Sequence, residues 1–242
     1  MSINDVIIVN LDLPEDNSNI VPTSIPLDIL YEDNWFLILN KPSGIAVHPS
    51  LLHYDDSLSN GVKYYFDSIG LKKKIRPINR LDYNTSGIVL FAKSEYIQEI
   101  LNKQMQDNIL KKEYLCVING LLEEKSGILD FPIDRKEGSI IERCISSDGK
   151  PSVTRYSVIK EFKNQNFSLV KCILETGRTH QIRVHFSHIG HPLIGDTLYG
   201  LPSDLISRQA LHSYKVSFIH PITKKELTII SPLAEDIKKI IK

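Results

Sequence analysis

Short apolar runs of strand length recur along this chain, and they constrain its fold more than any other sequence feature. Turn-forming or charged residues bound the runs, which is typical of strands in a sheet. The predicted strands are residues 35–39, 87–92, 113–119, 153–160, 167–176, 214–219 and 226–230. Helices are fewer and do not alternate regularly with these strands. The pattern therefore predicts an α+β fold with a mixed, mainly antiparallel sheet.

Four segments carry helix signals and are expected to flank this sheet. Ser57 and Ser94 suit the N-cap position, while Gly70 and Gly190 suit helix ends. Apolar side chains follow each serine at helical spacing. The predicted helices are residues 57–70, a segment opened by Ser94, a short helix within residues 178–190 and a last one within residues 233–242.

Charge is unevenly distributed along the chain. Residues 1–40 hold seven Asp or Glu and no Lys or Arg, so the remainder has 29 basic against 22 acidic side chains. A basic body is compatible with a polyanionic partner without requiring one. We predict an acidic leader or linker over residues 1–26 and one domain over residues 27–242.

Several classes of protein are disfavoured by what the sequence lacks. No apolar run approaches the twenty residues of a membrane span, and the first residues carry no basic cluster of a secretory signal. The three cysteines are far apart and form no CxxC pair, as expected of reduced thiols in the cytoplasm. Neither GxxxxGK[ST] nor GxGxxG occurs, so no nucleotide cofactor is expected.

The segment RPINRLDYNTSGIVLFAKS, residues 76–94, contains the first candidate for chemistry. Asp82 follows Arg80 by two residues and precedes a buried strand, which is a rigid place to hold a reactive group. The simpler interpretation is a loop carboxylate that pairs with Arg80. A second segment, residues 175–200, is too rich in Arg, His, Thr and Gln to be plain core and favours a functional site.

Histidines gather in this second segment and invite a metal-site hypothesis. His180, His185, His188 and His191 fall within twelve residues. However, His180 and His185 are five residues apart, which turns them away from each other on a helix. Nearby arginines would also repel a dication. We therefore expect no metal and assign these side chains to hydrogen bonds in a crowded site.

Hydrolase chemistry has less support. Ser86 with Asp82 and a histidine would be a possible triad, but the GxSxG elbow is missing and the two residues are very close in sequence. No second acid has a setting like that of Asp82, as glycoside hydrolysis would require.

Five motifs together resemble the RluA-type family of RNA pseudouridine synthases. They occur in the family's order and at its intervals, and the resemblance covers about residues 27–235. The motifs are KPSGIAVHPS, NRLDYNTSG, KKEYLCVING, ETGRTHQIRVHFSHIGHPLIGDTLYG and LHSYKVSFIHPITKKEL. The resemblance implies a central catalytic cleft, and isomerisation of uridine in ribosomal or transfer RNA without metal or cofactor. It also leads us to expect a monomer.

The resemblance also implies roles for individual residues. Asp82 would be the catalytic carboxylate, Tyr114 the platform that stacks on uracil, and Arg183 the partner of the carboxylate. Around this trio we expect substrate-binding side chains: Arg80, Thr85, Arg178, His180, Gln181 and Ile182. Whether the carboxylate attacks the sugar, attacks the base or abstracts a ribose proton stays open.

The chain departs from the family in two places. Asn79 stands where the family usually has a histidine, and we expect activity to survive this change because the histidine is not the nucleophile. Residues 1–26 are too short for the RNA-binding module found in many members, and resemble its trailing end.

A run of cations precedes the catalytic motif. Lys72, Lys73, Lys74 and Arg76 are either a solvated basic turn or a clamp for the RNA backbone, and we favour the clamp. Two rival functions remain. One is an RNA-binding protein of the same fold without catalysis, and the other is a metal-dependent nucleic-acid hydrolase that uses the histidines.

Overall fold

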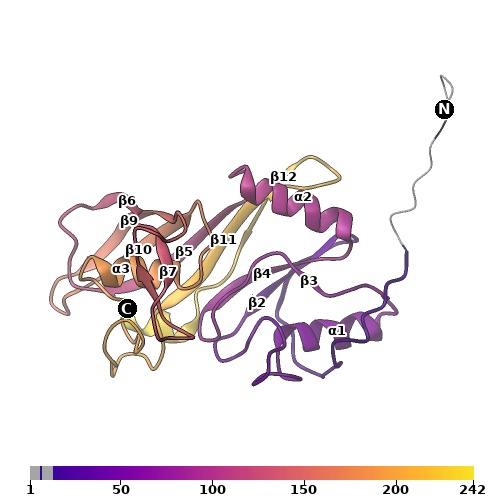
Figure 1. Cartoon of the computed structure of the whole chain (residues 1–242), viewed down its shortest axis with the longest axis horizontal. Helices are drawn as coiled ribbons and strands as arrows, with labels where there is room; N and C mark the ends of the chain where they lie inside the picture. Colours follow the sequence, from indigo (N-terminus) through magenta and orange to yellow (C-terminus); the bar gives the residue numbers. More distant parts are fainter. Residues whose placement is uncertain (1–5, 7–12) are drawn as a thin grey trace.

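In this computed structural model, which describes residue 6 and residues 13–242, ten strands form one long sheet and two more pair separately (Figure 1). The strands are β1 (Ile29–Glu32), β2 (Phe36–Lys41), β3 (Arg76–Pro77), β4 (Ser86–Ala92), β5 (Lys111–Asn119), β6 (Ser126–Asp130), β7 (Ile133–Arg135), β8 (Arg143–Ile145), β9 (Val153–Phe162), β10 (Phe167–Leu174), β11 (Leu211–Ile219) and β12 (Glu226–Ile230). The helices are α1 (Leu58–Ser68), α2 (Glu95–Gln106), α3 (Gln181–His188) and α4 (Glu235–Ile240).

The main sheet runs in the order β1-β2-β4-β11-β5-β10-β9-β6, with β3 beside β4 and β12 beside β11. Among the described strand pairs, β4 and β11 are parallel and the others are antiparallel. The expected mixed, mainly antiparallel sheet of an α+β fold is therefore confirmed.

The sheet divides into two halves that are each continuous in sequence. The N-terminal half, residues 29–106, contains β1 to β4 with α1 and α2. The C-terminal half, residues 111–240, contains β5 to β12 with α3 and α4. Figure 1 shows the halves side by side, with β11 and then β5 on the side of the C-terminal half that meets β4.

Helices cover both faces of the N-terminal half. On β2, Leu37 packs with the α1 side of the sheet, whereas its neighbour Ile38 packs with the α2 side. On β4, Val89 and Leu90 divide in the same way. Successive strand residues point to opposite faces, so burial on both faces requires a continuous apolar run instead of alternation.

The C-terminal half repeats this arrangement. On β5, Cys116 belongs to the core beneath α3, and Val117 belongs to the core beneath α4. The apolar residues of α3 that enter the first core are Ile182 and Phe186. Each half is thus a layer of strands between two helices. This packing holds in place β4 and β11, the strands through which the two halves meet.

The junction between the halves is narrow. Strands β4 and β11 pair through two residue positions, Ser86 with His212 and Gly87 with Ser213. Gly87 has a φ of 109°, and a Cβ at this position would lie 2.2 Å from the Ser213 carbonyl oxygen. Glycine therefore permits both the local backbone conformation and the close approach of the two strands.

The predicted strands and helices are confirmed, with differences of a few residues at several of their ends. Strand β11 begins at Leu211, before the predicted start at residue 214. Helix α3 begins only at Gln181 because His180 adopts a left-handed φ of 59°. The last helix is limited to Glu235–Ile240. The short strands β1, β3, β6, β7 and β8 were not predicted, since they have two to five residues and most of their side chains are not buried.

The described part of the acidic leader lies against the domain. The Glu15 amide donates to the Lys72 carbonyl at 2.9 Å, and the Thr23 amide donates to the Asn60 carbonyl at 3.2 Å. Residues 1–5 and 7–12 of the predicted leader lie outside the described residues.

In the described part of the chain, none of the helices combines the length and apolar character needed to cross a membrane.

Candidate active site

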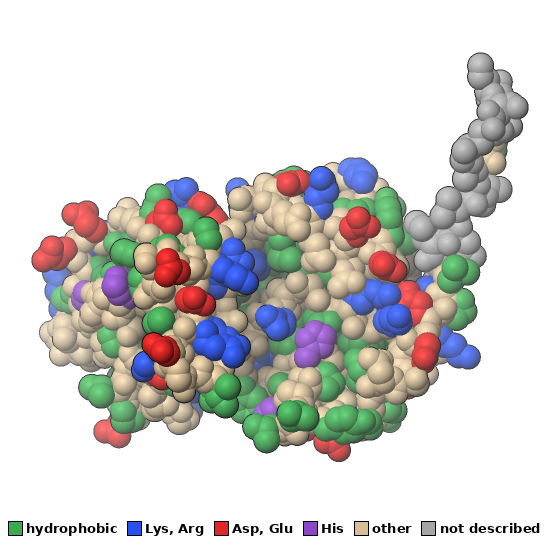
Figure 2. Space-filling model, in the orientation of Figure 1, with side chains coloured by type: hydrophobic (Ala, Val, Ile, Leu, Met, Phe, Trp, Pro, Cys, Tyr) green, Lys and Arg blue, Asp and Glu red, His purple; other side chains and the backbone are tan. Residues whose placement is uncertain are grey.

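A cleft of about 680 Å³ lies where the two halves meet, and Asp82 is on its wall. Its lining comes from residues 78–82, the end of α2 with Leu110, two side chains of β5, and residues 174–179. Figure 2 shows the surface hollowed between the halves, with Lys and Arg side chains on the rim. Asp82 itself lies in the loop between β3 and β4, just before the narrow junction.

The guanidinium of Arg183 joins Asp82 to a second carboxylate. Its Nη1 donates to Asp82 Oδ2 at 3.0 Å, while Nε and Nη2 donate to the two oxygens of Asp196 at 2.7 and 2.9 Å. Asp196 is 1 % exposed, and it also accepts from the Leu198 and Tyr199 amides. The fork on Asp196 fixes the plane of Arg183, so its third nitrogen is aimed at Asp82.

This pairing keeps Arg183 charged. Burial works against its charge, but the hydrogen bonds and charge of Asp196, together with Asp82, raise the pKa of Arg183 above its usual value. Arg183 therefore presents a charged hydrogen-bond donor to Asp82. Asp196 was not among the predicted site residues.

Three consecutive carbonyls hold the backbone of the Asp82 loop. The Asp82 carbonyl accepts from the Thr85 amide at 3.0 Å, the Tyr83 carbonyl from Lys41 Nζ at 2.9 Å, and the Asn84 carbonyl from Arg208 Nη1 at 2.9 Å. The loop is thus tied both to its own next turn and to two basic side chains, Lys41 and Arg208, from distant parts of the chain.

Lys41 was not predicted as a site residue, although it opens the KPSGIAVHPS motif. Its side chain is fully buried, and Nζ also donates to the Pro42 and Ile45 carbonyls, each at 2.8 Å. Burial lowers the pKa of Lys41 to about 7, and the charge of Arg208 acts in the same direction, while Asp82 opposes both. Lys41 therefore organises the turn beside Asp82 without facing the cleft.

Arg208 is a second cation that was not predicted. Its Nε and Nη2 donate to the two oxygens of Asp236 on α4 at 2.7 and 2.9 Å. Nη2 also lies 3.2 Å from Ser86 Oγ, which in turn lies 2.9 Å from His212 Nδ1. Ser86 is the first residue of β4, so Arg208 reaches the start of the strand that follows the Asp82 loop.

Tyr114 lines the cleft together with Asp82. It is 5 % exposed and projects from β5. Burial raises its pKa to about 12, although a hydrogen bond with the Ser213 side chain acts in the opposite direction. Tyr114 thus stays an uncharged phenol at neutral pH, and an uncharged ring is suited to stacking on a base.

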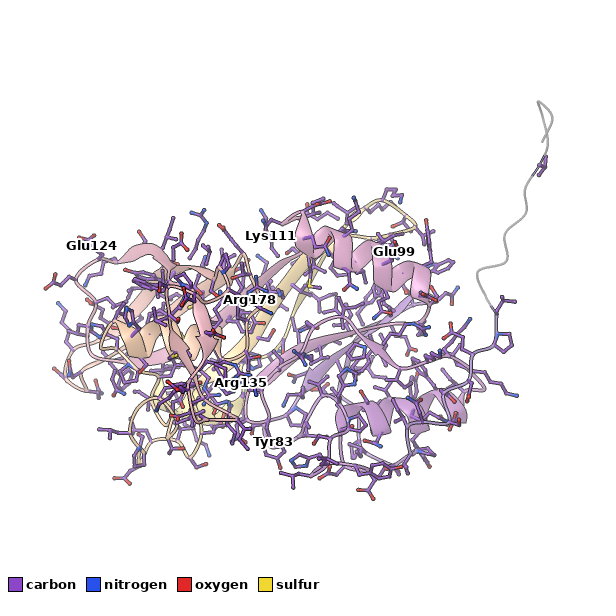
Figure 3. All side chains as sticks on the ribbon, in the orientation of Figure 1. Tyr83, Glu99, Lys111, Glu124, Arg135 and Arg178 are labelled. Atoms are coloured by element: carbon purple, nitrogen blue, oxygen red, sulfur yellow. The ribbon has the colours of Figure 1, made fainter. Side chains whose placement is uncertain are left out.

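The predicted substrate-binding residues fall into two groups. Arg80 and Arg178 are exposed and line the cleft, and Figure 3 shows Arg178 at the centre of the molecule. His180 also reaches the site, with Nε2 3.8 Å from Asp82 Oδ1 and Nδ1 2.8 Å from the Tyr199 hydroxyl. Burial lowers the pKa of His180, so its ring is neutral at physiological pH.

The other predicted residues, Thr85, Gln181 and Ile182, line a smaller pocket together with Asp82 and Tyr114, and they also support its walls. The Gln181 amide is buried and satisfied by Thr176, the Arg178 amide, the Val153 carbonyl and Thr154. Thr85 is buried and accepts from Gln209 at 3.2 Å, and Ile182 belongs to the core beneath Tyr114. These side chains hold the walls in place, and their polar groups are already occupied.

The acidic leader contacts two of the four residues in the basic run that precedes Asp82. Lys73 is 4 % exposed and donates to the Leu13 carbonyl, and Arg76 forms an ion pair with Glu15. Both side chains are engaged within the protein, so the predicted clamp has less support at these two positions. Lys72 and Lys74 are exposed, and for them the clamp stays a prediction.

The four clustered histidines do not converge on one point. His185 Nδ1 lies 3.0 Å from Thr154 Oγ1, His188 packs against the Phe131 ring, and His191 Nδ1 lies 2.8 Å from the Asn119 carbonyl. Within the described residues, no group of three or more His, Cys, Asp or Glu side chains is arranged to hold a metal ion.

Asn79 has a structural role at the position where a histidine was expected. Its Nδ2 donates to the Ile88 carbonyl, and its Oδ1 accepts from the Leu90 amide, both at 2.9 Å. The side chain thus completes the edge of β4 and fixes where the Asp82 loop begins.

Comparisons with known proteins agree with this geometry. Residues 35–188 match a family model described as RNA pseudouridylate synthase. The chain is 40% identical over 238 residues to YjbO of Bacillus subtilis, described as an uncharacterized RNA pseudouridine synthase, covering 98% of this chain and 83% of the relative.

A relative with a more specific name is ribosomal large subunit pseudouridine synthase D of Zymomonas mobilis. It is 36% identical over 253 residues, covering 98% of this chain and 78% of that protein. Among solved structures, human RNA pseudouridylate synthase domain containing 1 is 27% identical, with a TM-score of 0.70 over 87% of this chain and 84% of that one.

Proposed function

This chain belongs to the RNA pseudouridylate synthase family and is an RNA pseudouridine synthase, an isomerase, and we propose that it modifies uridines of ribosomal RNA with Asp82 as its catalytic carboxylate. The ribosomal assignment is supported by several relatives that are named as ribosomal large subunit enzymes. Transfer RNA is the alternative substrate. We further propose that the protein acts in the cytoplasm as a monomer.

The reaction detaches uracil from the ribose at nitrogen 1 and rejoins the ribose to carbon 5. A uridine within folded RNA must leave its stack before these atoms are accessible, which requires a few kcal/mol. The cleft beside Asp82 offers a place for the extruded nucleotide, and the phenol ring of Tyr114 offers a flat surface for its base. Arg80, on the same wall, is free to contact the RNA that surrounds the vacated position.

Asp82 needs to be ionised and oriented to act as nucleophile or base. The observation that carries the proposal is the hydrogen bond from Arg183 to Asp82, with the remaining guanidinium nitrogens fixed on Asp196. A guanidinium locked in this way presents one donor to a carboxylate inside the cleft. Substrate and product are isomers, so the overall conversion consumes no second substrate.

The test is tritium release from RNA that carries label at carbon 5 of uridine. Wild-type protein should release label from large-subunit ribosomal RNA transcripts, and Asp82→Asn should release none while its RNA affinity stays within about threefold, since asparagine keeps the shape and removes the charge. Release by the variant at the wild-type rate would exclude Asp82 as the catalytic group.

The same assay separates the alternatives. Transfer RNA transcripts test the second substrate class, and label release from them alone would overturn the ribosomal assignment. An RNA-binding protein without catalysis would bind labelled RNA and release nothing. Pseudouridine mapping of total RNA from cells with and without the protein would then identify the modified position.

A further inference from the structure

Lys112 lies in the cleft but has no part in the site described above. It precedes Tyr114 by two residues on β5, so both side chains point to the same face of the sheet. Both line the cleft with Asp82. Two residues of a strand span about 7 Å, so the backbone positions of Lys112 and Tyr114 are separated by about the length of one nucleotide.

The ammonium group of Lys112 has no anionic partner among the described residues. The two nearest carboxylates in sequence and register are engaged elsewhere: Glu113 pairs with Lys215 at 2.7 Å, and Glu175 pairs with Arg155. Burial lowers the pKa of Lys112, and no neighbouring charge offsets this effect. A partly buried cation without a partner is unfavourable, so an anion that binds in the cleft would stabilise the charged form of Lys112.

A second cation lies beside it. A Cβ on Gly177 would come within 3.4 Å of Lys112 Nζ, so the ammonium reaches the loop that carries Arg178. Arg178 donates from Nε to the Pro151 carbonyl at 3.1 Å, which leaves its Nη groups without a partner in the described structure. Its side chain is exposed and lines the same cleft (Figure 3).

We propose that Lys112 and Arg178 form a phosphate subsite that holds a phosphodiester group flanking the uridine placed beside Asp82. The inference rests on the proposed function and deepens it, because it states how the target nucleotide is held by its backbone. The ammonium supplies a point charge and the guanidinium supplies two directed donors, a combination suited to phosphate oxygens. The missing side chain at Gly177 leaves space between them.

The first experiment compares Lys112→Met with Lys111→Met. Lys111 is the neighbouring residue on β5, is exposed and does not line the cleft, so it is a matched control (Figure 3). Binding of uridine, uridine 5′-monophosphate and uridine 3′-monophosphate is followed by NMR titration. Lys112→Met should weaken binding of one monophosphate by roughly tenfold without affecting the nucleoside, and Lys111→Met should leave all three unchanged.

A second measurement uses ribosomal RNA transcripts at several salt concentrations. Lys112→Met should reduce the slope of log affinity against log salt by about 0.7 to 1, because the variant neutralises one phosphate fewer. If Lys112→Met does not fold, Arg178→Met at its exposed position serves for both measurements.

Equal loss of nucleoside and monophosphate binding, or no loss of either, would overturn the subsite. This outcome is independent of the proposed function, which the tritium assay tests separately. A wild-type protein that releases no label but distinguishes monophosphate from nucleoside through Lys112 would retain the subsite and lose the catalytic assignment.

Discussion

At the scale of the residue, the site depends on one guanidinium that serves two carboxylates. Arg183 was expected to pair with Asp82, but its firmer attachment is the two-oxygen contact with Asp196. The sequence does not reveal this contact, because Asp196 reaches Arg183 only when the chain after α3 folds back over the helix. The carboxylate in the cleft is thus positioned by a second one behind it.

Arg183→Lys should reduce the single-turnover rate by roughly 100-fold, although the charge is kept. Lysine cannot hold both oxygens of Asp196 and also direct a donor to Asp82, since it lacks the planar fork. The rate is measured at saturating RNA, and affinity is measured separately. Weakened RNA binding with a normal rate would instead indicate that Arg183 contacts a phosphate.

His212 predicts a dependence of stability on pH. Burial, with the charge of Arg208, lowers the pKa of His212 from 6.5 to about 4, so the folded protein holds the ring neutral. In the unfolded chain, the ring of His212 binds a proton below about pH 6.5. The contribution of His212 to the free energy of unfolding is therefore complete above pH 6.5 and is lost as the pH falls toward 4. The total loss is roughly 3 kcal/mol at about 1.4 kcal/mol per pH unit.

The measurement is urea unfolding of wild type and His212→Asn between pH 7 and pH 4. The pKa values of His48, His180 and His185 are also lowered by burial, so the wild-type slope contains their contributions as well. Removing His212 should flatten the slope. Equal slopes for both proteins would show that His212 is not held neutral in the fold.

At the scale of the element, the contact between β4 and β11 is the most demanding feature of the sheet. Gly87 has a φ of 109°, and a Cβ added at this residue would lie 2.2 Å from the Ser213 carbonyl oxygen. Gly138 offers a matched control, because its φ of 74° is also positive but nothing lies within 4 Å of a Cβ there.

Gly87→Ala should therefore destabilise the protein by roughly 2–4 kcal/mol, and Gly138→Ala by about 1 kcal/mol from backbone strain alone. Both values come from urea unfolding. The difference between the two variants measures the clash with β11. Similar losses for both would mean that the strands move apart without penalty, and that their junction does not constrain the Asp82 loop.

The accuracy of sequence-based prediction also differs between elements. Strands β2 and β4 were predictable because helices cover both faces of the sheet there, so these strands are nearly continuous apolar runs. The proposed catalytic residues Asp82, Tyr114 and Arg183 were suggested by family motifs, and the structure brings these three side chains together. Lys41 and Arg208 were missed because their partners include backbone carbonyls far away in sequence, which leave no residue-type pattern.

At the scale of the whole molecule, the acidic leader changes the electrostatic interpretation of the basic body. Residues 13–26 contact the loop after α1 and engage Lys73 and Arg76. The surplus of seven positive charges beyond residue 40 is therefore partly neutralised before any RNA arrives. Exposed cations such as Lys72 and Lys74 remain available for the backbone of a substrate.

Replacing Lys72 and Lys74 together by alanine should weaken binding of target and non-target RNA alike. The salt-dependence slope should fall by about 0.7 to 1 for each phosphate that the variant no longer neutralises. The single-turnover rate at saturating RNA should not change, because neither residue lines the cleft. An unchanged slope would support the interpretation of this run as a solvated turn.

The division of the site between two continuous halves has a consequence for the chain while it is being made. Asp82 is synthesised early, and its guanidinium partner follows 101 residues later. Arg208, which holds the Asn84 carbonyl, and Asp236, which holds Arg208, leave the ribosome later still. Domains begin to form from the N-terminal side during translation. A nascent chain therefore carries an Asp82 carboxylate without its guanidinium partner until the segment with Arg183 has been added, and the contacts that hold the Asp82 loop through Arg208 form only after Asp236 has followed.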